Sequence, residues 1–459
     1  MSQSRGQWSG KLGFILAAAG SAVGLGNLWK FPYITYENNG GAFVLVYIAA
    51  IALVGLPIMM AETLIGRRTQ LNAVGAFNKL GGKLWTPVGF LGVLAGFVIL
   101  SYYSVVAGWT LRYIVMAISG ELGNMAAVPQ ELDTFFGDYT ANGTQQIIGL
   151  FLFMTFTTTA VIFGVKRGIE RVSKILMPIL LLILASLAIY ATTTAGFEKA
   201  MHFLFHPDFS TLTRGAVLEA MGHAFFTLSL GMGCILTYGS YMRKTDSIPK
   251  AALQITLLDT LVAILACVVM FSIIFSNPDM QISKSAGILF TTLPTVFVKM
   301  PGGNFIMTMF YFLVAFAALT STISLLEVIS SYSIDELKWS RKRAALTVAF
   351  SVFIFGSLNA LSLGANNKLS SFNLFGKETT IGMFGTMDYL ASNWLLPVGG
   401  LLIALFTGWF LSVRENRIEL EEGHGELPAF PVWLFLIRFV APIAVGAIVV
   451  SVILGAEYQ

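Results

Sequence analysis

Long apolar stretches recur along the whole chain, each separated from the next by a short polar segment. A membrane-spanning helix needs about 20 consecutive, mostly apolar residues. We therefore predict an all-α integral membrane protein with eleven transmembrane helices. The expected spans are residues 11–36, 41–65, 86–118, 145–163, 170–193, 214–240, 250–275, 303–334, 344–363, 385–413 and 430–455.

Glycines and polar residues interrupt the first and the sixth of these spans. The first contains AAAGSAVGLGNLWKFP (residues 17–32), and the sixth contains EAMGHAFFTLSLGMGCILTYGSY (residues 219–241). Glycine weakens a helix, and lipid offers no partner for the backbone groups of a broken one. Close helix packing through Gly20 and Gly24 is one explanation. The other is that the helices are unwound around a polar site.

The two interrupted spans hold corresponding positions if spans one to five and six to ten are repeats. Because each repeat would cross the membrane five times, an odd number, the second repeat would be inverted relative to the first. Interrupted helices at matching positions of inverted repeats line the binding sites of transporters. Freed N–H groups favour an anion and freed carbonyls favour a cation, so we expect a solute with a carboxylate, accompanied by a small hard cation.

Polar side chains within other spans point to the same kind of site. Asp259 is the only charge in the seventh span, and ionisable residues inside a membrane are functional candidates. In the eighth span, Ala317, Thr320 and Ser321 are spaced three and four residues apart and therefore share one helix face. An oxygen cage for Na⁺ could therefore form from Gly20, Val23, Ala317, Thr320 and Ser321. Glu62 could accept hydrogen bonds from an unwound helix, whereas the pattern assigns Glu327 no role.

Composition and charge agree with a membrane protein. The chain has 459 residues, is 56% hydrophobic and 11% charged, and has a mean hydropathy of +0.76. Its two cysteines imply no disulfide framework, and its four histidines show no metal-ligand spacing. We find no catalytic constellation and expect no enzyme. Most loop Lys and Arg residues share a side with Arg5 and Lys11, which predicts a cytoplasmic N-terminus and an extracytoplasmic C-terminus.

Several segments closely resemble bacterial amino-acid transporters of the neurotransmitter:sodium symporter family. They include GQWSGKLGFILAAAGSAVGLGNLWKFPYITYENNGGAF, GLPIMMAETLIG, LSYYSVVAGWT, GIERVSKILMP, FFTLSLGMG, YGSYMRK, AALTSTIS and DELKWSRKRA. The resemblance implies a 5+5 inverted-repeat transporter fold with unwound helices 1 and 6. Residues 1–195 would form the first repeat, 210–413 the second, and 428–459 an additional helix. It further implies Na⁺-coupled amino-acid uptake across the cytoplasmic membrane by alternating access.

The same resemblance implies one substrate site and two Na⁺ ions that are transported with the substrate. The substrate would lie among Ala22, Gly24, Leu25, Gly26, Ile99, Tyr103, Phe226, Thr227, Ser229, Met232, Ser321 and Leu325. The first Na⁺ would be held by Ala22, Asn27, Thr227 and Asp259, and the second by Gly20, Val23, Ala317, Thr320 and Ser321.

Two departures from the family pattern refine these expectations. Asp259 stands where some bacterial members have Asn, and Ala263 stands where others have Ser or Glu. Asp259 could supply the negative charge that chloride or Glu provides elsewhere, so we expect chloride independence. Gly24 cannot hold an amine as the Asp of monoamine transporters does, so the substrate should carry a carboxylate. The apolar lining favours neutral hydrophobic or aromatic L-amino acids, with glycine and GABA still open.

The resemblance also implies gates on both sides of the site. Arg5 and Asp335 would form the cytoplasmic ion pair, with Trp8 and Tyr241 beside it. On the outer side Lys30 would face Asp388, and a lysine lacks the bidentate fork of the usual arginine. This latch should therefore be looser or bridged by water.

Two alternative functions remain from the sequence. The same fold could couple amino-acid transport to protons, with Asp259 as the proton carrier. A non-transporting amino-acid sensor is the other alternative. In either case the partners are an amino acid and the lipid bilayer, with no nucleic acid, and the oligomeric state is open.

Overall fold

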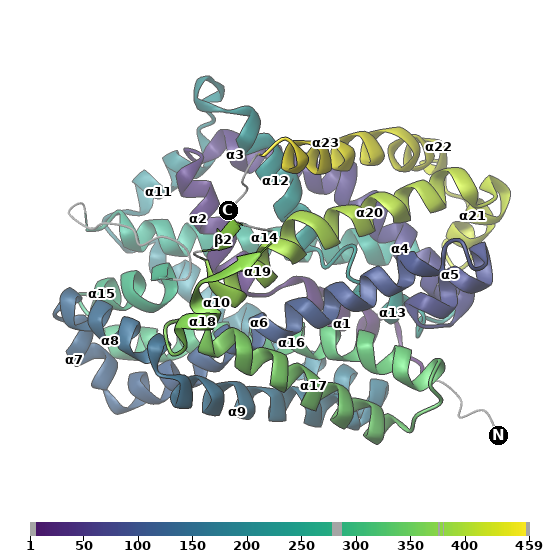
Figure 1. Ribbon diagram of the computed structural model, residues 1–459. Helices are drawn as coiled ribbons and strands as arrows, with labels where there is room; N and C mark the ends of the chain where they lie inside the picture. The colour runs from purple at the N-terminus through teal and green to yellow at the C-terminus, as the bar shows by residue number, and fades with distance from the viewer. Residues whose placement is uncertain (1–5, 278–286, 375–376, 380, 456–459) are drawn as a thin grey trace.

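The computed structural model describes residues 6–277, 287–374, 377–379 and 381–455, and Figure 1 shows them as a bundle of helices. Within the described residues, nine helical segments are long and apolar enough to cross a membrane. They are α3–α4 (Gly41–Thr69), α6 (Thr86–Ser119), α9 (Gly143–Ile162), α10 with its preceding turn (Val165–Ala191), α14 (Ile248–Ile274), α16 (Gly303–Asp335), α17 (Arg341–Leu361), α19–α20 with its last turn (Gly382–Phe410) and α22–α23 (Phe430–Ile453).

The first and sixth expected spans are both broken. Helix α1 (Lys11–Ala22) meets the segment Gly26–Glu37, which includes α2 (Phe31–Glu37), at a bend of 50°. Helices α12 (Arg214–Thr227) and α13 (Cys234–Gly239) flank a non-helical stretch. The sequence prediction that these two spans are interrupted is confirmed.

Backbone geometry explains why glycines occupy the second break. Gly231 and Gly233 have φ angles of 76° and 75°, a left-handed conformation that glycine adopts without steric cost. A Cβ atom on Gly231 would lie 2.5 Å from the carbonyl oxygen of Leu396. Ser229, between Leu228 and Leu230, also has a positive φ of 54°. The glycines at positions 231 and 233 therefore allow the backbone conformation that this break requires.

The two broken spans lie at the centre of the bundle. Helix α1 packs against α10, α14 and α16, while α16 packs along α6. Helix α13 packs on α4, and α12 contacts α3 and the C-terminal α23. Side chains from α1, α6, α12, α14 and α16 can therefore meet at the breaks.

Shorter elements connect these helices. Asn72, Ser247 and Ser340 cap α5, α14 and α17, because each side-chain oxygen accepts a backbone N–H of the first turn. Strands β1 (Phe372–Leu374) and β2 (Lys377–Thr379) form an antiparallel pair with Phe372 opposite Thr379. The remaining helices are α5 (Ala73–Gly81), α7 (Glu121–Ala126), α8 (Pro129–Ala141), α11 (Phe197–Phe205), α15 (Leu293–Phe297), α18 (Asn367–Ser370) and α21 (Val413–Glu421).

Candidate substrate and ion site

A central cavity lies where the two broken spans meet α6 and α16. Eleven of the twelve predicted substrate residues line it: Ala22, Gly24, Gly26, Ile99, Tyr103, Phe226, Thr227, Ser229, Met232, Ser321 and Leu325. Leu25 does not line it, but its backbone N–H donates to the Tyr103 hydroxyl at 2.8 Å. The cavity measures about 20 Å³, so walls such as the Met232 side chain must move to admit an amino acid.

The absence of a side chain at position 24 keeps one wall of the cavity open. A Cβ atom on Gly24 would lie 2.7 Å from both the Tyr103 hydroxyl and the Ser321 Oγ atom. The Tyr103 oxygen accepts the Leu25 N–H, which leaves its own proton to be donated to another acceptor. An anionic group entering here would meet an O–H donor at the end of a broken helix.

The residues predicted for the first Na⁺ lie together. The Asn27 Nδ2 atom donates to the Asp259 carboxylate at 2.8 Å, and the Asn27 Oδ1 atom accepts the Gly24 N–H at 2.9 Å. The Thr227 hydroxyl lies 3.0 Å from the same Asp259 oxygen. Ala22 and Thr227 line the same cavity. This arrangement offers carbonyl, amide, hydroxyl and carboxylate oxygens, which are the ligands of hard cations.

Asp259 is fully buried in α14. In the part of the chain that the structure describes, no Lys or Arg lies within 4.0 Å of its carboxylate. A buried carboxylate without a cationic partner is costly. Binding of a cation beside it would offset that cost.

The residues predicted for the second Na⁺ also converge. The Ser321 Oγ atom lies 3.4 Å from the carbonyl oxygens of Gly20 and Val23 and 3.1 Å from that of Ala317. The Thr320 hydroxyl donates to the Ala317 carbonyl at 3.0 Å. The Ser321 hydroxyl thus lies beside all three carbonyls, and the Thr320 hydroxyl shares the Ala317 carbonyl with it.

Glu62 supports the second break, as its position in the sequence predicts. This buried α4 residue accepts the Gly231 N–H at 2.7 Å. Gly231 lies outside any helix and has no helical partner for that N–H. The carboxylate therefore satisfies a backbone group that unwinding exposes.

Aromatic and charged side chains pack together on the predicted cytoplasmic side. Trp8 is buried, donates from Nε1 to the Tyr238 carbonyl at 2.9 Å, and packs edge-on against Tyr241. The Tyr241 hydroxyl donates to Glu327 at 2.6 Å, and Arg341 binds both Glu327 oxygens at 2.7 and 2.8 Å. Sequence reasoning left Glu327 without a role, and the available signal was its place as a charged residue inside an expected membrane span.

Of the predicted Arg5–Asp335 ion pair, Asp335 is the member that the structure describes. Arg5 lies outside the described residues. Asp335, at the end of α16, accepts hydrogen bonds from the backbone and side-chain nitrogens of Asn72 at 3.0 and 3.1 Å. This carboxylate thereby ties α16 to the start of α5.

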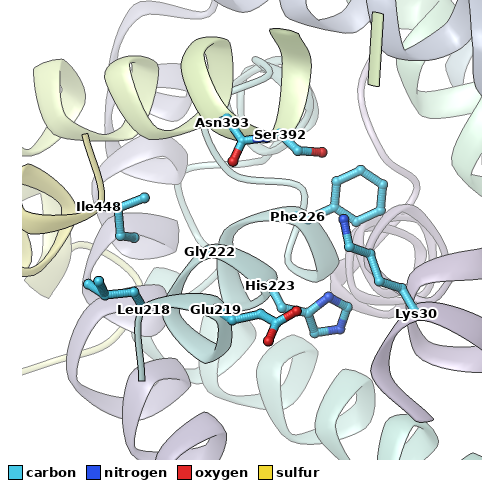
Figure 2. Close-up of a pocket in the computed structure, with 9 residues that line it drawn as sticks. All are labelled: Lys30, Leu218, Glu219, Gly222, His223, Phe226, Ser392, Asn393 and Ile448. Atoms are coloured by element: carbon cyan, nitrogen blue, oxygen red, sulfur yellow. The ribbon is translucent and has the colours of Figure 1, made fainter. Parts of the chain in front are cut away.

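A second, outer cavity lies beyond Phe226, and Figure 2 shows Lys30 and Glu219 facing it. Among the described residues, Phe226 is the one that the linings of both cavities share. The Lys30 ammonium lies 5.4 Å from the centre of the Phe226 ring, a cation–π geometry. Asp388 instead contacts the Ser392 hydroxyl at 3.3 Å. Among the described residues, Lys30 and Asp388 form no direct ion pair.

Sequence reasoning missed two residues that line the central cavity, Ser21 and Ser324. Ser21 directly precedes Ala22 at the end of α1, and Ser324 lies one turn beyond Ser321 on α16. Spacing along α16 could have identified Ser324, because residues three apart share a helix face.

Comparisons with known proteins agree with this arrangement. The profile of the Sodium:neurotransmitter symporter family matches residues 5–129 and 138–458. The sodium-dependent transporter YhdH of Bacillus subtilis is 38% identical over 449 residues, 97% of each chain. A sodium-dependent transporter of Haemophilus influenzae is 32% identical over 461 residues, 98% of each chain. The crystal structure of MhsT in complex with L-phenylalanine has 42% sequence identity and a TM-score of 0.89, covering 98% of this chain and 100% of that one.

The predicted all-α membrane-transporter fold class and the prediction of a transporter rather than an enzyme are therefore confirmed, whereas the count of eleven transmembrane helices stays a prediction. Family profile, relatives and solved structure each extend over nearly the whole chain. This chain belongs to the Sodium:neurotransmitter symporter family and is a multi-pass, sodium-dependent membrane transporter.

Proposed function

We propose that the protein imports neutral hydrophobic or aromatic L-amino acids together with two Na⁺ ions, by alternating access. The observation that carries this proposal is the convergence of both oxygen clusters on one cavity between the two broken spans. MhsT, which is similar over the whole chain, binds L-phenylalanine in its crystal structure.

The substrate carboxylate would lie at the Tyr103 hydroxyl and next to the first Na⁺. Its ammonium group would meet carbonyls of Ala22 and Phe226, and its side chain would lie between Ile99, Met232 and Leu325. Methionine adapts to differently shaped side chains because it is unbranched and flexible. Apolar walls favour a side chain without charge, because burying an unpaired charge is costly.

The ion sites would follow the two clusters described above. Asp259 would complete the first site with a fixed negative charge, so chloride would not be required. Na⁺ bound by Ser321 and Thr320 would link α16 to the carbonyls at the end of α1. Ion binding would thereby favour the closed arrangement of these helices.

Alternating access would open the cavity first to one side and then to the other. Outward opening would require Phe226 to swing away, with Lys30 and Asp388 acting as the outer gate. Inward opening would require Trp8 and the Tyr241–Glu327–Arg341 contacts to separate. We place the N-terminus in the cytoplasm, with residues 1–195 and 210–413 as inverted repeats and 428–459 as an additional helix at the extracytoplasmic C-terminus.

Uptake into proteoliposomes tests the proposal. Purified protein is given radiolabelled L-amino acids with an inward Na⁺ gradient, or with Na⁺ replaced by choline at fixed pH. Na⁺-dependent accumulation, with competition ranking hydrophobic and aromatic amino acids first, is the expected result. Equal uptake in choline that responds to a pH gradient would overturn the sodium sites and favour proton coupling through Asp259. Binding without accumulation would favour a sensor.

A further inference from the structure

Two histidines lie one helical turn apart at the end of α11, far along the chain from either broken span's predicted ligands. His202 belongs to the last turn of this helix, and His206 directly follows it. Their rings stack at a centroid distance of 4.6 Å, with 23° between the ring planes. Both residues are exposed. We call His202 and His206 the histidine pair.

The backbone of α11 fixes the spacing of the histidine pair. The His206 N–H donates to the His202 carbonyl at 2.9 Å, so the helical hydrogen bonding reaches from one histidine to the other. Residues four apart are neighbours on one helix face. Ala200 and Leu204 are buried, and α11 packs against α14. The histidine pair therefore occupies the face of α11 that points away from the protein.

The end of α11 is also held in place by its neighbours. The Phe203 ring lies 5.0 Å from the Phe271 ring and 5.5 Å from the Phe275 ring, between centroids. A Cβ atom on Gly40 would clash with the Phe203 carbonyl, so this backbone lies directly on the turn between α2 and α3 (Figure 1). Two imidazoles presented at a fixed spacing form a preorganised site, which loses less freedom when a ligand binds.

Imidazole nitrogens at this spacing suit a particular class of ion. Zn²⁺, Ni²⁺ and Cu²⁺ bind imidazole well, whereas Mg²⁺ and Ca²⁺ prefer oxygen ligands. Cations are also favoured at the C-terminal end of a helix, where carbonyl groups are left without helical donors. In the part of the chain that the structure describes, no group of three or more His, Cys, Asp or Glu residues could hold a metal ion. Water would therefore complete the coordination of an ion held by two imidazoles.

We propose that the histidine pair binds one divalent transition-metal ion of the Zn²⁺, Ni²⁺ and Cu²⁺ class. This site goes beyond the proposed function, because it shares no residue with the substrate and Na⁺ sites. On the proposed topology it faces the extracytoplasmic side. The other two histidines are separate from it: His223 is buried beside the outer cavity, and the His424 Nδ1 atom lies 2.6 Å from the Ser247 hydroxyl.

Sequence reasoning found no metal-ligand spacing among the four histidines, and the reason is local. Residues 202 and 206 share a face only if a helix runs between them. The expected spans end at residue 193 and resume at residue 214, so they place no helix there. Helix α11 supplies the context that turns a four-residue spacing into two neighbouring imidazoles.

Binding calorimetry tests the proposal. Untagged protein in detergent is treated with a chelator, transferred to Na⁺ buffer and titrated with ZnCl₂ or MgCl₂. We expect one Zn²⁺ per chain and no binding of Mg²⁺. His202→Ala and His206→Ala should each weaken Zn²⁺ binding about tenfold or more, because a second ligand at high effective concentration is lost.

Two further variants separate the histidine pair from histidine content. His202→Ala/Lys199→His keeps four histidines but moves one of them so that it lies seven residues from His206, about 10 Å along the helix. It should bind Zn²⁺ as weakly as His202→Ala. His424→Ala removes a histidine that lies elsewhere, and it should keep wild-type binding.

Each outcome decides the proposal. Zn²⁺ binding of wild-type strength in either single variant or in His202→Ala/Lys199→His would overturn it. Electron paramagnetic resonance of wild-type protein with Cu²⁺ needs no variant and should show two coordinated imidazole nitrogens; one or none would contradict the site. Because these measurements involve no transport, absence of Na⁺-dependent uptake would overturn the proposed function and leave the metal site standing.

Discussion

The side-chain amide of Asn27 donates to the carboxylate of Asp259 across 2.8 Å, joining the break in the first span to α14. The orientation of that amide is fixed from its other end, because Asn27 Oδ1 accepts the Gly24 N–H. Thr227, at the end of α12, contacts the same carboxylate. One acidic side chain thus connects both broken spans, and its charge decides what else can bind beside it.

Replacing Asp259 by Asn should make transport depend on chloride or abolish it. The amide keeps the shape of the side chain but removes a charge next to the first Na⁺ site. Two unit charges about 4 Å apart interact by about 4 kcal/mol at a protein-like dielectric. We expect uptake in gluconate buffer to fall at least tenfold relative to wild type, measured beside uptake in chloride buffer.

Asp208→Asn is a suitable control for that experiment, since Asp208 lies in an exposed loop, where its carboxylate accepts hydrogen bonds from the neighbouring Ser210. It should transport like wild type in both buffers. Chloride-free kinetics that stay unchanged in Asp259→Asn would contradict the charge argument.

Ser321→Ala should lower the apparent affinity of transport for Na⁺ without changing the fold. Its hydroxyl faces the carbonyls of Gly20 and Val23, so its loss would remove one ligand from the second Na⁺ site. Loss of one ligand should raise the half-saturating Na⁺ concentration about tenfold or more, as measured from uptake rates over a Na⁺ series. Ser333→Ala is matched to it, because Ser333 is buried on α16 and bonds its own helix four residues back. An equal increase of the half-saturating Na⁺ concentration in both variants would contradict the second Na⁺ site.

Tyr241→Phe should loosen the predicted cytoplasmic side. The substitution keeps the ring against Trp8 but removes the 2.6 Å hydrogen bond to Glu327. A hydrogen bond to a charged group contributes about 1.5–3 kcal/mol, enough to shift a conformational equilibrium more than tenfold. Backbone amides of α1 should therefore exchange hydrogen faster, as measured by mass spectrometry. Tyr36→Phe, at an exposed ring, should leave this exchange unchanged. Identical exchange in both variants would show that the bond does not hold this side closed.

Local patterns predicted the membrane spans, the two breaks and the polar face of the eighth span, because these are local properties of the sequence. The substrate residues and the first Na⁺ site were instead implied by the resemblance to the symporter family. The spacing of Ala317, Thr320 and Ser321 placed them on one face, and the structure sets that face against Gly20 and Val23. Side-chain contacts that depend on how distant helices pack could not be predicted from the sequence. Arg341 meets Glu327 only after the chain reverses between α16 and α17.

The outer gate was predicted less completely for the same reason. Lysine at position 30 predicts a looser or water-bridged latch, and among the described residues it forms no direct ion pair with Asp388. The actual neighbour of its ammonium group, the Phe226 ring, depends on a side-chain conformation that no motif encodes. Glu219 likewise faces the outer cavity without belonging to any recognised motif.

Glu62→Ala should destabilise the protein by leaving the Gly231 N–H without a partner inside the membrane. That hydrogen bond is 2.7 Å long, and its donor lies in the second break, where no helical carbonyl can replace the carboxylate. Loss of a buried hydrogen bond to a charged group costs about 1.5–3 kcal/mol. Glu62→Gln keeps one acceptor oxygen at the same reach, so it should be affected less. Thermal unfolding in detergent, followed by the monodisperse fraction on size exclusion, should rank wild type above Glu62→Gln and Glu62→Ala last. Glu37→Ala, at the exposed end of α2, should unfold like wild type. If Glu62→Gln proved as unstable as Glu62→Ala, the negative charge rather than the acceptor geometry would hold the broken helix in place.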